Sequence, residues 1–116
     1  MSAGATLLAL VNEKRAAAGC AALVADDDLA RLARAHSTSM RDRSYLGIAD
    51  PEGVSLLDLG GRAAAVAQGE SDANDVLDGW LDDPASSTAL LDCGMDSIGV
   101  GVVKGDGGPW WTALLS

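Results

Sequence analysis

The spacing of apolar residues changes near the end of this chain from a helical period to a strand period. In the segments 7–18, 29–40 and 73–81, apolar side chains recur every three or four residues, which predicts amphipathic helices. From Ile98 onward valines alternate with glycines, a spacing of two that is typical of a strand. The glycine-rich stretch that follows predicts a hairpin turn into a second strand at 110–115. Helices followed by a terminal antiparallel hairpin predict an α+β fold.

Local signals predict where some of these elements begin. Asp83 and Pro84 are typical of an N-cap and the first residue of a helix, which we expect to end near Leu91. Ser71 is the expected cap of the preceding helix. Segment 64–68 fits either a short strand or a loop.

Size and charge narrow the possible functions. At 116 residues we expect one domain, spanning 1–116. Eight basic residues against 17 acidic ones give a net charge of −9, which argues against nucleic acid and anionic membrane surfaces as partners.

No apolar run approaches the roughly 20 residues of a membrane span. Segment 5–11 predicts a helix rather than a signal peptide, so for an exported protein we expect the signal or anchor to lie outside this sequence.

The two cysteines, Cys20 and Cys93, lie far apart, with no CxxC motif and no histidine beside them. Zinc requires about four ligands at characteristic spacings, and neither cysteine has them nearby. Two interpretations stay open: a pair of buried free thiols, or one disulfide that closes a long loop and stabilises the fold by roughly 4 kcal/mol. A disulfide would place the protein outside the cytosol.

The sequence offers few residues for catalysis. His36 is the only histidine, so a Ser-His-Asp or Cys-His site would have to use it. It shares the apolar face of its helix with Leu32 and Met40, and we expect a hydrogen-bonded core histidine. The paired carboxylates at 26–28 and 82–83 are adjacent in sequence rather than opposed across a cleft, so we expect them to cap helices and face solvent.

An ordered set of segments resembles the CAP superfamily, also called the SCP-like extracellular domain, in its short bacterial (actinobacterial) form. These are 11–16 with its Asn-x-x-Arg signature, Gly19-Cys20, 29–40, 45–53, Gly79-Trp80, 84–91, 98–101 and Trp111-Thr112. The resemblance implies a three-layer α-β-α sandwich in which helices flank an antiparallel sheet. It also implies that Cys20 pairs with Cys93, because related sequences carry cysteines at both places.

The chain departs from the family where the family's cleft holds two histidines and two acidic residues. Ile48 stands at the first histidine position, Ala64 at a glutamate position and Ser86 at the second histidine position. Asp83 alone retains an acid near its family position, and His36 lies in the same region. One carboxylate leaves too few ligands for a transition metal, so we expect a degenerate, metal-independent cleft and no cofactor.

These departures predict a non-catalytic binding or scaffolding domain that is secreted or lies in the cell envelope. In one version the more apolar cleft accepts a lipid or another hydrophobic small molecule; in the other it is closed, and the surface binds an envelope protein. The alternative is an enzyme, a hydrolase or a cyclase-like catalyst, with a site outside the family pattern around His36, Asp83 and Ser86. A groove that brings His36 within hydrogen-bond reach of a serine and an acid would favour the enzyme. Neither hypothesis specifies an oligomeric state.

Overall fold

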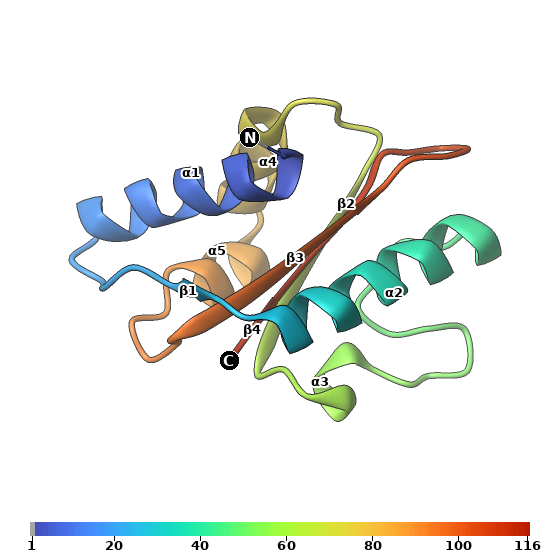
Figure 1. The fold of residues 1–116 in the computed structure, drawn as a ribbon, viewed down its shortest axis with the longest axis horizontal. Coiled ribbons are helices and arrows are strands. Elements are labelled where there is room, and N and C mark those ends of the chain that lie inside the picture. Colours follow the sequence, from blue (N-terminus) through green and yellow to red (C-terminus); the bar gives the residue numbers. More distant parts are fainter. Residues whose placement is uncertain (1) are drawn as a thin grey trace.

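The computed structural model describes residues 2–116, and Figure 1 shows its helices and strands. In chain order the elements are α1 (Ala3–Ala17), β1 (Val24–Ala25), α2 (Asp27–Arg43), α3 (Leu56–Leu59), β2 (Ala63–Gln68), α4 (Ala73–Asp82), α5 (Pro84–Leu90), β3 (Ser97–Val103) and β4 (Trp110–Leu115). The predicted terminal hairpin is therefore present as β3 and β4, and segment 64–68 belongs to a strand.

The four strands form one sheet in the order β1-β3-β4-β2. β4 pairs antiparallel with β3 on one side and with β2 on the other, in agreement with the antiparallel sheet expected from the sequence. β1 differs: it was not predicted, and it pairs parallel to β3 through Val24 and Ser97 and through Ala25 and Ile98. A strand of two residues is too short to show an alternating pattern.

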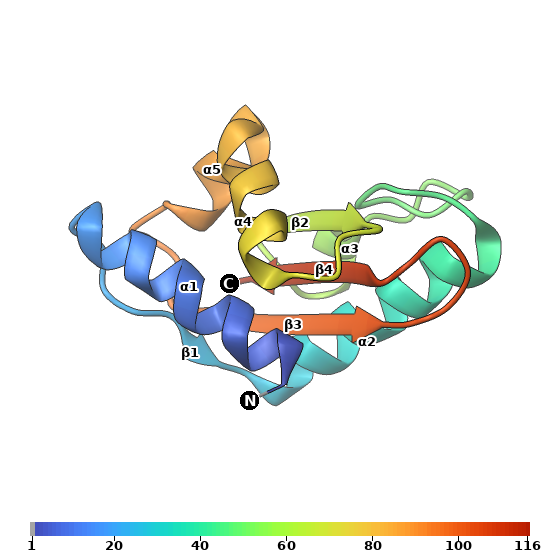
Figure 2. The same cartoon turned by 90° about the horizontal axis from the view of Figure 1, so that it is seen from above.

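The elements form the three layers of the predicted α-β-α sandwich. In Figure 1 the sheet is seen near its edge, with α1 and α4 above it and α2 and α3 below it; Figure 2 shows the helices on either side of the strands. Each face of the sheet has its own apolar cluster. One includes Leu7, Trp80 and Trp111 beside α1 and α4, and the other includes Leu29 and Leu114 beside α2.

The burial of two tryptophans and the positions of two helix caps can be compared with the sequence. Trp80 and Trp111 are 3% and 1% exposed, and Trp111 lies in β4, within the segment 110–115 that was predicted to be the second strand of the hairpin. Asp83 caps α5, with Pro84 in its first turn. The predicted cap of α4 is one residue out: Asp72, not Ser71, accepts the N–H of Asn74, at 2.8 Å. Its carboxylate also carries the charge that a helix N-terminus favours.

Two glycines of β3 allow α2 to lie directly on the sheet. A Cβ at Gly99 would meet the backbone of Ala30, and one at Gly101 would meet the backbone of Arg34, in both cases well inside van der Waals contact. The alternating glycines thus mark the strand face that α2 covers. None of the helices within residues 2–116 is both long and apolar enough to cross a membrane.

Candidate functional site

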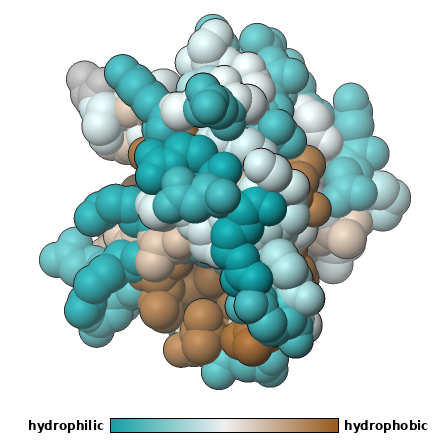
Figure 3. Space-filling model, turned by 90° about the vertical axis from the view of Figure 1, so that its right-hand side faces the viewer, coloured by the Kyte–Doolittle hydropathy of each residue, from teal (hydrophilic) through white to brown (hydrophobic). Residues whose placement is uncertain are grey.

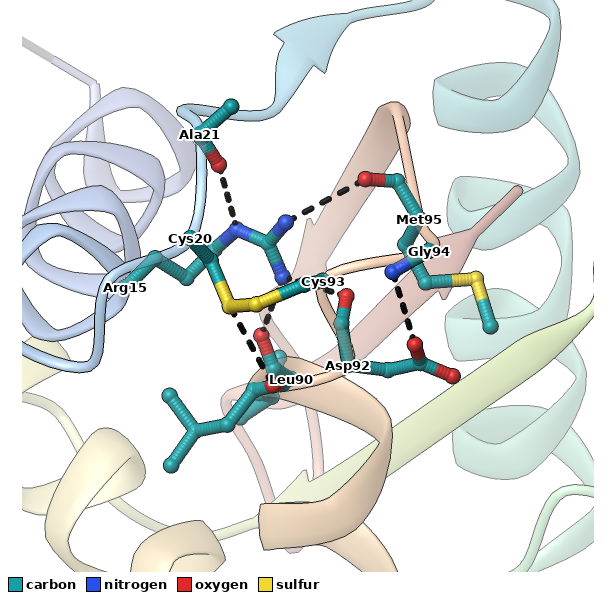
Figure 4. The surroundings of a disulfide bond; sticks show 9 residues. Arg15, Cys20, Ala21, Leu90, Asp92, Cys93, Gly94 and Met95 are labelled. Atoms are coloured by element: carbon teal, nitrogen blue, oxygen red, sulfur yellow. Dashed lines mark hydrogen bonds between the residues drawn. A yellow bond between two sulfur atoms is a disulfide. The ribbon is translucent and has the colours of Figure 1, made fainter.

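A disulfide joins the end of the α1 region to the loop before β3. Cys20 and Cys93 are bonded, with their Cα atoms 4.9 Å apart, and no cysteine in the described chain is free. The pairing implied by the family resemblance is confirmed, and the interpretation as two free thiols is wrong. Figure 4 shows that the side chain of Arg15 lies directly beside this disulfide.

Arg15 is fully buried, yet it forms no ion pair within residues 2–116. Its guanidinium instead donates hydrogen bonds to four backbone carbonyls, those of Ala21, Leu90, Asp92 and Met95, at 2.8–3.2 Å. Asn12, one turn earlier, binds the loop between α1 and β1 through Leu23. Its Oδ1 accepts the N–H of Leu23 at 2.8 Å, and its Nδ2 donates to the carbonyl of Leu23 at 3.1 Å. The Asn-x-x-Arg signature is therefore a structural element that fixes two loops.

His36 lies on the face of the sheet that α2 and α3 cover. Its side chain is 8% exposed, and Nε2 donates to Gly47 O at 2.6 Å. The ring of Tyr45 stands edge-on to it, with the ring centroids 5.8 Å apart. Tyr45 also pairs its hydroxyl with Ser39 Oγ at 2.9 Å. His36 is thus a hydrogen-bonded histidine of the kind expected from the sequence.

These residues border a hollow of about 150 Å³ between α2 and the segment that contains α3. We call it the α2–α3 hollow; its lining is Leu32, Ala35, His36, Ser39, Tyr45, Asp50, Val54, Leu56 and Leu59. Val54 and Leu59 are 43% and 55% exposed at its border, and Leu57 of α3 is 39% exposed. Figure 3 shows hydrophobic surface gathered at the lower side of the molecule, where α3 lies.

Asp83 and Ser86 lie in a different hollow, of about 270 Å³, between α4 and the end of β2. Ser86 donates to Asp83 Oδ2 through its hydroxyl at 2.7 Å and through its backbone N–H at 3.1 Å. These two bonds, the hydroxyl bond first, hold the pKa of the Asp83 carboxyl below its ordinary value. Asp83 therefore acts as the N-cap of α5, and Ser86 is the residue of the first turn that it binds.

With this geometry in view, comparison with known proteins decides the family. The family model described as "Cysteine-rich secretory protein family" (CAP) matches residues 8–115. The chain belongs to the CAP family. A sequence search of curated proteins found no significant match.

Solved structures agree with this assignment of the CAP domain. An extracellular protein containing an SCP domain from Bacillus anthracis superposes with a TM-score of 0.85 at 26% identity, over 97% of this chain and 39% of that protein. An outer surface protein from Borrelia burgdorferi gives 0.79 at 20% identity, over 95% and 88%. A cysteine-rich secretory protein from Staphylococcus aureus gives 0.67 at 18% identity, over 95% and 36%. The chain thus spans well under half of the Bacillus and Staphylococcus proteins.

The predicted cleft residues of this CAP domain do not line one common hollow. His36 borders the α2–α3 hollow, whereas Asp83 and Ser86 border the hollow beside α4. Ile48 and Ala64 line neither of the two: Ile48 accepts the N–H of Leu56 at 2.9 Å through its carbonyl, and Ala64 packs against the apolar cluster below the sheet. Within residues 2–116, no three His, Cys, Asp or Glu side chains lie together in a group suited to a metal ion.

Sequence reasoning missed the residues that surround His36. The sequence does not single out Ser39, Tyr45, Asp50, Val54 or Leu59 as site residues, although all five line the hollow. The signal was partly available, because segment 45–53 belongs to the family resemblance. Its packing on α2 is a tertiary contact, however, which no local pattern encodes.

Proposed function

We propose that this CAP domain is a non-catalytic binding domain of the cell envelope, and that its α2–α3 hollow receives an apolar side chain of a partner protein. The observation that carries the proposal is the hollow itself, which is bordered by the exposed side chains of Val54 and Leu59. Exposed apolar side chains around a hollow are typical of interaction sites. In this proposal the 116 residues act as one domain.

The size of the hollow favours a side chain over a whole lipid. Its volume is about 150 Å³, and an apolar cavity of roughly that volume holds a benzene-sized group. Pockets that enclose complete small-molecule ligands usually measure about 300–1,000 Å³. A leucine or phenylalanine side chain therefore matches the volume, whereas a fatty acid would leave most of its chain outside.

The polar groups around the hollow favour binding over catalysis. Nε2 of His36 is held by a backbone carbonyl, and the hydroxyls of Ser39 and Tyr45 bond to each other. Oδ1 of Asp50 accepts the backbone N–H groups of Glu52 and Val54 at 3.0 and 2.9 Å. None of these bonds joins His36 to a serine or an acid, as a general-base site would require.

Two observations support an extracellular location. A structural disulfide joins Cys20 to Cys93, and disulfides persist in oxidising compartments. The Bacillus and Borrelia neighbours are described as an extracellular and an outer surface protein. The net charge of −9 keeps such a domain soluble outside the cell.

The proposal can be tested by photo-crosslinking in producing cells. A photo-reactive residue at position 59 should yield a protein adduct, and the variant Ala35→Leu, which fills the hollow, should abolish it. Ala17→Leu on the exposed side of α1 is the matched control and should leave the adduct unchanged. A lipid adduct without a protein adduct would support the hydrophobic-ligand function instead, and an adduct that survives Ala35→Leu would reject the hollow as the site.

A further inference from the structure

One edge of the sheet is left open where β1 ends. β1 pairs with β3 only at Ser97 and Ile98, after which the chain leaves the sheet and enters α2. The rest of β3 has β4 on one side, and no strand of the described residues 2–116 lies on the other. Figure 1 shows this stretch of β3 facing the viewer, with α1 above it and α2 below it.

The pairing register shows which backbone groups point out of this open edge. Ser97 and Ser116 exchange both hydrogen bonds, at 2.9 and 3.1 Å. In an antiparallel ladder alternate residues then point toward β4, and the residues between them point away. Ile98 points away accordingly, since its carbonyl accepts the N–H of Asp26 at 2.9 Å. Val100 and Val102 also point away, and their outward groups have no hydrogen-bond partner within residues 2–116.

Two hollows adjoin along this edge. One of about 220 Å³ includes Ile98 and Val100, and the next, of about 290 Å³, includes Val100 and Val102. Both have Ser2 and Gly4 of the α1 region in one wall. Val100 is the residue of β3 that lines both hollows, and the second hollow continues along the unpaired part of the strand.

The charges along the edge have opposite signs at its two ends. Asp26 and Asp27 line the first hollow, and Arg34 and Lys104 line the second. The side chains of Arg34 and Lys104 form no hydrogen bond or ion pair within the described chain. In a protein with 17 acidic and 8 basic residues, two such cations beside one hollow form a local surface that attracts anionic groups.

The other edge of the sheet is treated differently. Nε1 of Trp80 donates to Val66 O at 2.8 Å, so a side chain occupies an outward carbonyl of β2. An edge strand that is capped in this way is protected against pairing with another chain. The edge at Val100 and Val102 has no such cap within residues 2–116.

We propose that the open edge of β3 binds an extended segment of a partner protein as an added strand, with an acidic side chain of that segment beside Arg34 and Lys104. Main-chain hydrogen bonds to Val100 and Val102 provide the pairing, and the charges at the two ends set the direction of the segment. This surface is separate from the α2–α3 hollow, so the inference stands independently of the proposed function.

The length of the edge defines the probes. From Ile98 to Lys104 an extended chain rises roughly 20 Å, about the length of a heptapeptide. The probes are the acetylated amides Lys-Thr-Val-Thr-Val-Thr-Glu and Glu-Thr-Val-Thr-Val-Thr-Lys, which present the acid at opposite ends. One of them should shift the amide signals of Val100 and Val102 in an NMR titration and slow their exchange with solvent. A third peptide, with proline in place of both valines, should do neither.

Two variants test the contacts. Val102→Pro removes an outward N–H that bonds to nothing within residues 2–116, so β3 and β4 keep their ladder. It should weaken binding of the peptide by about two- to tenfold, the effect of one lost hydrogen bond, whereas Val102→Ala should leave the binding unchanged. The double variant Arg34→Glu, Lys104→Glu should abolish the preference between the two peptides, because Asp26 and Asp27 at the other end then leave both ends of the edge negative. If Val102→Pro fails to fold by circular dichroism, this loss of preference decides the question.

Several outcomes would overturn the proposal. The first is that neither peptide shifts the amide signals of Val100 and Val102 at millimolar concentration. The second is that the preference for one peptide survives the substitutions Arg34→Glu and Lys104→Glu. In the first case Arg34 and Lys104 serve only to keep the edge from pairing. A concentration-dependent dimer in analytical ultracentrifugation, abolished by Val102→Pro, would show that a second copy of this chain occupies the edge instead of a partner.

Discussion

Nη1 of Arg15 donates a hydrogen bond to the carbonyl oxygen of Asp92 at 2.9 Å, immediately before the cysteine that closes the disulfide. The same nitrogen binds Leu90 O at 2.8 Å, and Nε binds Ala21 O, immediately after the other cysteine. One buried cation therefore holds both partners of the disulfide by their neighbouring carbonyls. The cross-link and the guanidinium fix the same two loops.

Replacing Arg15 with methionine should destabilise the oxidised protein by more than about 3 kcal/mol. Methionine keeps much of the apolar volume but leaves buried carbonyls without donors, each at a cost of about 1–3 kcal/mol. Urea unfolding followed by tryptophan fluorescence measures the change. Arg31→Met is the control, because Arg31 is exposed, and it should change stability by less than about 0.5 kcal/mol. Equal effects of the two substitutions would refute the role of Arg15.

Reduction of the disulfide should be tolerated by the native sequence and not by Arg15→Met. The cysteines are 73 residues apart, so the chain-entropy model gives the cross-link about 4 kcal/mol. Added to the loss at Arg15, this approaches the whole stability of an ordinary domain, about 5–15 kcal/mol. Circular dichroism in reducing buffer should show a folded native protein and an unfolded variant. A folded, reduced Arg15→Met would contradict this sum.

Features that depend on neighbouring residues could be predicted from the sequence, whereas features that depend on contacts between distant segments could not. The cap at Asp83 and the alternation from Ile98 are local signals. The helix α5 and the strand β3 begin where these signals predict. β1 was missed because Val24 and Ala25 gain their pairing only from β3, far along the chain. The wall of the α2–α3 hollow was missed for the same reason, since the segment around Tyr45 and Asp50 acquires its position by packing on α2.

Gly101→Ala should destabilise the fold by about 1–3 kcal/mol or more. The new methyl group would meet the backbone of Arg34, which can move only if the whole of α2 moves away from the sheet. Gly79→Ala provides the control, because nothing lies within 4 Å of a Cβ there and the residue is in helix α4. That change should stabilise the protein by up to about 1 kcal/mol. Thermal unfolding of the two variants should therefore shift in opposite directions, and shifts of the same sign would contradict the close approach.

Ser86→Ala should raise the pKa of the Asp83 carboxyl toward its ordinary value. The Ser86 hydroxyl is the main cause of the lowered pKa, and its loss leaves only the backbone N–H. A carboxyl whose pKa is lower in the folded state stabilises the fold above its unfolded pKa of about 3.9, and this contribution is lost as the pH falls through the folded value. The native chain should therefore retain α5 to lower pH than the variant.

A carbon-detected NMR titration of Asp83 measures this shift directly. Ser87→Ala is the matched control, because the side chain of Ser87 donates no hydrogen bond within the described residues. An unchanged Asp83 titration in Ser86→Ala would show that the hydroxyl is not the cause.

Zinc, manganese and calcium should show no stoichiometric site of micromolar affinity in calorimetric titrations. Ile48 and Ala64 have no ligand atoms in their side chains, and the Ser86 hydroxyl bonds to Asp83 at 2.7 Å. Zinc needs about four nitrogen, sulfur or oxygen ligands, and His36 already donates Nε2–H to a carbonyl. Calcium prefers six to eight converging oxygens.

His36→Ala distinguishes a built metal site from counterion attraction. Tight one-to-one zinc binding that disappears in this variant would contradict the prediction and restore the enzyme hypothesis. Weak calcium binding that falls with added salt would not, because a surface with a net charge of −9 attracts divalent cations without ordered ligands. The salt dependence therefore has to be measured together with the affinity: a coordinated ion keeps most of its affinity at high ionic strength, whereas a screened counterion does not.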